Sequence, residues 1–159
     1  MSNLEAAYHE ASHAVLAEKS CFHRVVKAIN ISKHGTGECP VSLSKEKVEA
    51  CGKEVHSGIS SDVEVTEDLV VILCGGYVGE WYAQEQYDGI TADINSASND
   101  HERAELMLSN AHINHDLDHY REFAGQILSQ DWDKVEKLAR YLINHGSIEP
   151  WDIPGVINA

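Results

Sequence analysis

The chain has 159 residues and a formal net charge of −14, because 26 acidic residues stand against 12 basic ones. This acidity excludes the usual nucleic-acid-binding proteins, which hold phosphates with clustered Lys and Arg. The 43% apolar and 24% charged residues are typical of a globular protein, and a chain of this length buries roughly 70% of its unfolded surface, so we expect residues 1–159 to form one domain.

The first part of the chain predicts a helix followed by a small β-sheet. Residues 4–19 repeat apolar side chains at a spacing of three to four, on a background of good helix formers, which indicates a helix. Residues 23–31 mix β-branched and polar residues and predict a strand, with a turn at 33–37 and a short second strand at 40–43. Residues 44–64 are polar and are assigned no element.

A second helix is expected after Thr66, which we take as its N-cap, and it continues through residues 68–86. Its first part is apolar on nearly every side, so it should be buried. Gly75 and Gly76 would weaken an isolated helix, which suggests that another element packs closely against them.

Residues 87–97 are interpreted as a loop, and a third helical region starts near Ser98. A fourth helix is predicted from about Asp131 to His145, with Gly146 as the residue that ends it. The predicted fold class is therefore mostly α, of the α+β type, with a small β-sheet near the N-terminus.

His9, Glu10 and His13 form an H-E-x-x-H motif within the first predicted helix. Residues four apart lie on one face of a helix, so both imidazoles can bind one Zn²⁺. Glu10 is displaced around the helix, where it can take a proton from a water molecule whose pKa the zinc lowers toward 7. The motif predicts a zinc hydrolase with a third ligand from elsewhere in the chain; the simpler interpretation is a helix with two surface histidines.

The chain resembles the peptidase domain of the FtsH-type ATP-dependent zinc metalloproteases. Residues 8–14 read YHEASHA, similar to the family's YHEAGHA, and HRVVKAINI follows where the family has a VHKVTI-like strand. GGYVGE at 75–80 falls where the family has GGRxAEE, and ASND at 97–100 matches the end of its TTGASND segment. The closing LARYLINHGSIEPWDI resembles LAxxLLExETLxGxEI, so the resemblance covers most of residues 6–153.

The resemblance implies a zincin-like helical peptidase domain with a defined zinc site. His9, His13 and Asp100 would be the zinc ligands and Glu10 the general base. Glu80 would accept a hydrogen bond from a ligand imidazole. The fourth position on the zinc would stay open for water or substrate.

Two other carboxylates could serve as the third ligand, and two positions differ from the family pattern. Asp88 and Asp93 lie in the same loop as Asp100 and compete with it as third ligand, but only Asp100 has the A-S-N context. Ser12 and Ser96 stand where the family has glycine, and a positive φ at position 96 would change the approach of Asp100.

The family's ATPase motif, G-x-x-x-x-G-K-[ST], does not occur in this sequence, so ATP dependence is not carried over. Such an enzyme would cleave flexible segments or depend on a separate unfoldase or adaptor. Substrate chains are expected to add as a strand at the sheet edge near residues 24–43. Family peptidase domains assemble as rings, and oligomerisation stays open here.

The remaining histidines are interpreted as structural or surface residues. His112, His115 and His119 have the spacing i, i+3, i+7, which would place them on one side of a helix, where they could bind adventitious metal but more simply form a solvated face. His101 is expected on a helix surface. The others are assigned to loops or strand edges: His23, His34, His56 and His145.

Localisation follows from three observations. The N-terminal segment lacks the basic and apolar regions of a signal peptide. The most apolar stretch, residues 69–78, is much shorter than the roughly 20 residues of a membrane helix. The four cysteines have no metal-binding spacing. We expect a soluble cytoplasmic protein with reduced thiols, binding neither membranes nor nucleic acids.

The leading hypothesis is a zinc metalloendopeptidase that hydrolyses peptide bonds in flexible or unfolded proteins. A second hypothesis is a catalytically silent binding or regulatory module of the same fold. A third is a zinc hydrolase of non-peptide amides.

Overall fold

The structure is a computed structural model that describes residues 3–33 and 40–159; most of the turn predicted at 33–37 lies outside these ranges. The described part is mostly helical, with two small two-stranded antiparallel sheets. The α-helices are α1 (Asn3–Lys19), α2 (Lys45–Ala50), α3 (Val63–Gln86), α4 (Ser98–Asn110), α5 (Leu117–Gln130), α6 (Trp132–His145) and α7 (Ile153–Ile157). The strands are β1 (His23–Val25), β2 (Ile29–Asn30), β3 (Val41–Leu43) and β4 (Ser147–Ile148).

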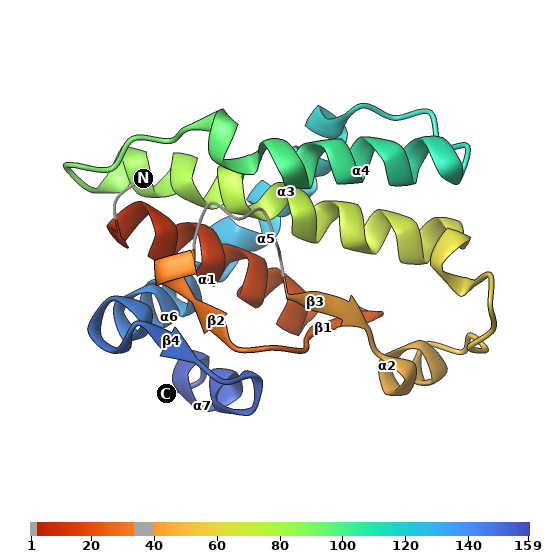
Figure 1. Cartoon of the computed structure of the whole chain (residues 1–159), viewed down its shortest axis with the longest axis horizontal. Helices are drawn as coiled ribbons and strands as arrows, with labels where there is room; N and C mark the ends of the chain where they lie inside the picture. Colours follow the sequence, from red (N-terminus) through yellow and green to blue (C-terminus); the bar gives the residue numbers. More distant parts are fainter. Residues whose placement is uncertain (1–2, 34–39) are drawn as a thin grey trace.

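Helix α1 occupies the middle of the molecule, with α3 and α4 on one side and α6 and α7 on the other (Figure 1). It packs directly against α3 and α6, while α3 also packs against α4 and α5. Its buried positions include alanines at nearly every turn, such as Ala7, Ala11 and Ala14. These small side chains let neighbouring helices approach from both sides, and the helix predicted over residues 4–19 is confirmed as α1.

Glycines on α3 bring this helix unusually close to α1. A Cβ atom at Gly79 would lie 1.8 Å from Ser12 Oγ, and one at Gly75 would lie 2.2 Å from Leu16 Cδ1. Neither contact is sterically allowed, so larger residues would push the two helices apart. The close packing expected at Gly75 and Gly76 is confirmed.

The single strand predicted over residues 23–31 is wrong, because this segment divides into two strands with different partners. β1 pairs with β3, with Val25 opposite Val41, so the predicted sheet near the N-terminus and its second strand are confirmed. β2 instead pairs with β4 near the C-terminus, with Ile29 opposite Ile148. Local composition signals an extended chain, but it does not specify which distant segment pairs with it.

The polar segment at 44–64, assigned no element, contains α2. Ser44 caps this helix by accepting a hydrogen bond from the Lys47 backbone N–H at 3.3 Å. Val48 is the buried residue of α2 and joins a small separate cluster with Phe22 and Ile59. One buried apolar residue in a six-residue helix is too little to produce a visible periodicity.

Helix α3 begins at Val63, and the predicted N-cap at Thr66 is wrong. Asp62 is the N-cap, and its carboxylate accepts a hydrogen bond from the Val65 N–H at 3.2 Å. Thr66 is buried inside the first turns, where its hydroxyl donates to the Ser60 carbonyl at 3.0 Å. Both residue types favour N-caps, and the structure uses the earlier one.

The helical region predicted from Ser98 is two helices, α4 and α5. Between them His112 adopts a φ of 57°, and Asp116 caps α5. Only His119 of the three histidines predicted to share a helix face therefore lies on a helix, so that prediction is wrong. Helix α6 and its terminating residue, Gly146 with φ of 81°, are confirmed.

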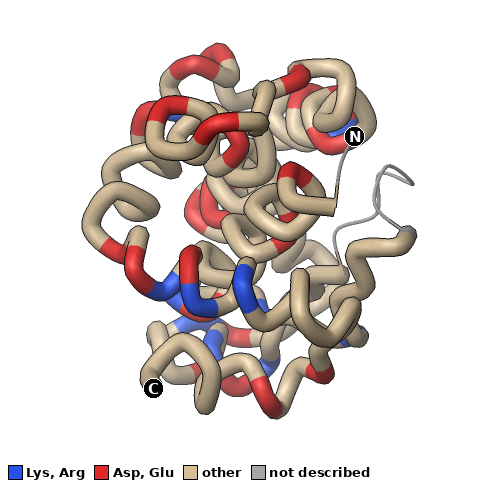
Figure 2. Tube along the Cα trace, turned by 90° about the vertical axis from the view of Figure 1, so that its left-hand side faces the viewer, with Lys and Arg blue, Asp and Glu red and all other residues tan. Residues whose placement is uncertain are grey.

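None of the helices in the described ranges is long and apolar enough to cross a bilayer. Acidic positions are spread over the whole face shown in Figure 2, and most of the basic positions among them lie in the half that holds the C-terminus. Cys21, Cys51 and Cys74 are free thiols, and Cys39 lies outside the described residues.

The capping role of Asp62 can be tested by substitution. Replacing Asp62 with Ala removes the acceptor for the Val65 N–H, so the free energy of unfolding should fall by about 1 kcal/mol in urea titrations. Asp62→Asn keeps a capping side chain but loses the charge that faces Lys53 at 3.1 Å. Asn should therefore retain most of the stability; equal losses for Ala and Asn would assign the effect to the ion pair instead.

Candidate metal centre

Three side chains from two distant segments converge on one buried point. His9 and His13 come from successive turns of α1, and Asp100 comes from the first turn of α4, 87 residues after His13. The two imidazole Nε2 atoms are 3.1 Å apart, and Asp100 Oδ2 lies 3.1 Å from His13 Nε2 and 3.7 Å from His9 Nε2. All three residues are at most 4% exposed.

These separations match those of ligands around one metal ion. Nitrogen and oxygen ligands about 2.0–2.1 Å from a tetrahedral zinc are about 3.3–3.4 Å from one another. The group of His9, His13 and Asp100 could therefore hold a metal ion. The interpretation of the two histidines as surface residues is wrong, because α3 and α4 cover them.

Hydrogen bonds at the far side of each ring set the tautomers. His9 Nδ1 lies 3.0 Å from Glu80 Oε2, and His13 Nδ1 lies 2.7 Å from the Ile72 carbonyl oxygen. Because carboxylate and carbonyl oxygens accept only, both Nδ1 atoms must donate. In neutral rings this leaves the Nε2 lone pairs directed at each other and at Asp100, an arrangement that a cation stabilises.

The electrostatics of the cluster also indicate a site for positive charge. Burial lowers the pKa of His9, but hydrogen bonds to Asp100 and Glu80 outweigh this and leave the pKa raised. Burial raises the pKa of Asp100, but His13 and His9 outweigh it and hold the pKa well below its usual range. Asp100 Oδ1 is also buried without a hydrogen-bond partner, as expected for a carboxylate that completes its contacts with a metal ion.

Gly76 provides the space beside the imidazoles. A Cβ atom at this position would lie 2.3 Å from His9 Nε2 and 2.6 Å from His13 Nε2. Both clashes are with the nitrogens that would bind the metal. The glycine on α3 therefore forms one wall of the centre, a role that sequence reasoning had assigned only to helix packing.

Glu80 is fully buried and connects the centre to the loop between α3 and α4. Its Oε2 accepts from His9 and from the Ser96 hydroxyl, which lies 2.8 Å away. Ser96 belongs to a short 3₁₀ turn, Ile94–Ala97, and none of the described non-glycine residues except His112 has a positive φ. Position 96 therefore does not require the glycine of the family pattern. The hydrogen bond from the Ser96 hydroxyl to Glu80 is a contact that the sequence did not predict.

The two competing carboxylates do not reach the cluster. Asp93 is exposed and accepts from the Asn95 N–H at 2.9 Å, which caps the 3₁₀ turn. Asp88 is exposed in the loop that follows α3. Glu10 lies on α1 between the two histidines and is partly exposed, unlike its buried neighbours.

His101 is buried, so its predicted place on a helix surface is wrong. Its ring meets Tyr77 edge-on at a centroid distance of 6.2 Å, and its Nδ1 lies 3.4 Å from an Arg121 nitrogen. Burial, followed by the charge of Arg121, lowers the pKa of His101 and favours the neutral ring. His101 therefore supports the start of α4 beside Asp100 and lies outside the ligand cluster.

Neither the known protein-family models nor the curated proteins contain a match for this chain.

The wall formed by Gly76 yields a direct test of the metal centre. Gly76→Ala places a methyl group between the two imidazoles, so bound metal in the purified protein, measured by mass spectrometry, should fall by about one ion per chain. Gly155→Ala is the matched control, because a Cβ at this helical position in α7 meets nothing within 4 Å. Equal metal content in the two variants would show that no ion binds between His9 and His13.

Proposed function

We propose that this protein is a zinc-dependent endopeptidase that cleaves flexible or unfolded protein segments. The observation that carries the proposal is the buried cluster of His9, His13 and Asp100, with Glu10 partly exposed on the same helix. Glu80 supports the cluster by accepting from His9.

The ligand set favours zinc. Two imidazoles and one carboxylate suit this ion, and three protein ligands are the usual number in catalytic zinc sites, where structural sites have four. A bound zinc ion supplies Lewis acidity, which lowers the pKa of a water molecule and polarises the scissile carbonyl. The chain supplies the orientation of the ligands through the hydrogen bonds of His9 to Glu80 and of His13 to Ile72.

Glu10 is the proposed general base and acid. Its carboxylate takes one proton from the attacking water and then delivers that proton to the amine leaving group, as the peptide C–N bond breaks. The carboxylate is regenerated in each cycle. Its partial exposure lets it meet substrate from the solvent side, whereas the ligands are closed off by α3 and α4.

The edge of β3 is the proposed place for the substrate backbone. Within the described residues β3 pairs with β1 alone, which leaves its other edge without a ladder. A pocket of about 200 Å³ lies along this strand, lined by Val41–Leu43 and by Leu69, Arg103 and Met107. An added strand must be extended, so this edge selects flexible or unfolded segments.

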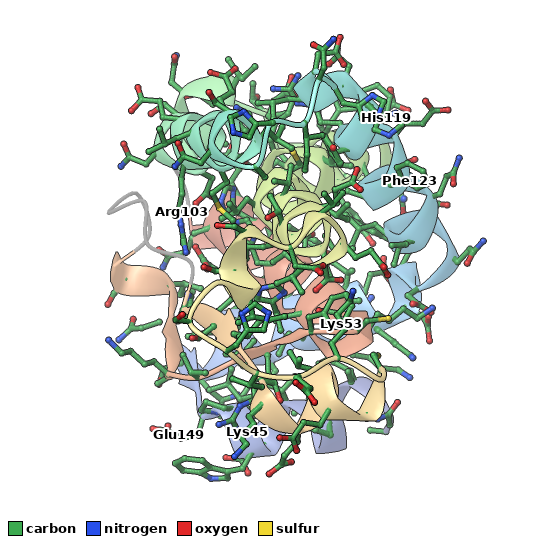
Figure 3. The ribbon with its side chains drawn as sticks, turned by 90° about the vertical axis from the view of Figure 1, so that its right-hand side faces the viewer. Lys45, Lys53, Arg103, His119, Phe123 and Glu149 are labelled. Atoms are coloured by element: carbon green, nitrogen blue, oxygen red, sulfur yellow. The ribbon has the colours of Figure 1, made fainter. Side chains whose placement is uncertain are left out.

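Helical spacing places this pocket in line with the metal centre. Leu69 and Gly76 are seven residues apart on α3, and Asp100 and Met107 are seven apart on α4, so each pair shares one helix face. Arg103, between the last two, projects from α4 and is labelled in Figure 3. A chain lying along β3 would therefore lead toward His13 and Asp100.

The decisive test is Glu10→Gln, which removes the base while the ligands remain. Cleavage of an unfolded protein such as labelled casein should fall by about 10²–10⁴-fold, while zinc content stays at the wild-type level. Glu105→Gln, an exposed change on α4, is the matched control and should leave the rate unchanged. Equal cleavage by the Glu10 variant would refute the mechanism, and a zinc-loaded wild type without hydrolytic activity would favour the silent binding module.

A further inference from the structure

A second group of metal-binding side chains lies at the start of α5, away from the centre described above. It consists of Glu67 on α3, His115 in the loop before α5, and His119 in the first turn of α5. One ligand atom from each residue lies within 4.8 Å of the others. Glu67 precedes Gly76 by nine residues, roughly 13 Å along a helix axis, so the two groups do not share ligands.

The imidazoles of His115 and His119 lie against each other. Their rings stack with a centroid distance of 4.2 Å and an interplanar angle of 11°. His119 also meets the edge of Phe123 at 5.2 Å, and its backbone N–H is fixed by Asp116 at 3.2 Å. His119 and Phe123 are labelled on α5 in Figure 3, at the periphery of the molecule. A metal ion lies close to the plane of each imidazole that binds it, so the two stacked rings must turn before their nitrogens converge on one cation.

The carboxylate is oriented by a buried phenol. Tyr120, only 1% exposed, donates its hydroxyl hydrogen to Glu67 Oε2 at 2.8 Å. A hydrogen bond to a ligating carboxylate from outside the ligand set is a common feature of protein metal sites.

The chemistry of the group selects a class of ligand. Two imidazoles and a carboxylate suit zinc and its divalent transition-metal neighbours better than the oxygen-seeking Mg²⁺ or Ca²⁺. We propose that Glu67, His115 and His119 bind a divalent transition-metal cation such as Zn²⁺. Since the ligands are partly or fully exposed, water completes the coordination, and the bound cation ties the start of α5 to α3.

Zinc titration of the metal-free protein, followed by calorimetry, tests this proposal. The wild type should bind two Zn²⁺ ions per chain. His119→Ala should bind one, as should His115→Ala, which changes an exposed loop residue and serves as a second variant if helix α5 is perturbed. His112→Ala is the matched control, because this exposed histidine of the same loop lies outside the cluster, and it should still bind two.

The positioning role of Tyr120 has a separate readout. Tyr120→Phe keeps all three ligands and removes the hydrogen bond to Glu67, so two ions should still bind, with affinity at the second site about 10–100-fold weaker. An unchanged affinity would show that the phenol does not position the carboxylate for a cation.

His13→Ala separates this proposal from the proposed function. If both proposals hold, this variant binds one ion, which is lost when His119→Ala is added. A wild type that binds one ion, lost in His13→Ala and retained in His119→Ala, would overturn the second site and leave the catalytic centre standing. One ion lost in His119→Ala and retained in His13→Ala would support the second site and overturn the centre.

Discussion

The contact between α1 and α3 is the constraint on which the rest of the structure depends. Gly75, Gly76 and Gly79 let the two helices approach so closely that Ser12 and the imidazoles fill the space a Cβ would occupy. The same contact closes the core and aims the histidine rings. Helix packing and the geometry of the candidate centre are therefore coupled, because any side chain that separates the helices also displaces His9 and His13.

The buried centre concentrates polar groups that together favour positive charge. Two imidazoles and a carboxylate face each other in largely buried surroundings, where electrostatic interactions are stronger than in solvent. The protein offsets the cost of burying these groups with two hydrogen bonds on the far side of the rings, to Glu80 and Ile72. An apolar core of the same shape would be simpler to stabilise, so the cluster is a candidate for ligand binding.

The sequence predicted the features of the fold and site that depend on neighbouring residues. It did not predict contacts between distant segments. The H-E-x-x-H spacing and the repeat of apolar residues predicted α1, and Gly146 predicted the end of α6, because each depends on neighbouring residues. The β2–β4 pairing was missed because strands of two residues carry no register signal. The bond from His13 to the Ile72 carbonyl was also missed, since a backbone acceptor has no side-chain signature. The family resemblance stays a prediction.

The helices that pack against α1 follow it in the chain, and this order has a consequence for biosynthesis. Helix α1 is synthesised before α3, α6 and α7, the helices that cover it. Until Asp100 is synthesised, no third ligand exists, and until α6 appears, one apolar side of α1 has nothing to pack against. The nascent helix thus presents an uncovered apolar surface until the residues of α6 have been made, the kind of surface that chaperones recognise. All three ligands of the centre are therefore present before the residues that complete the burial of this surface.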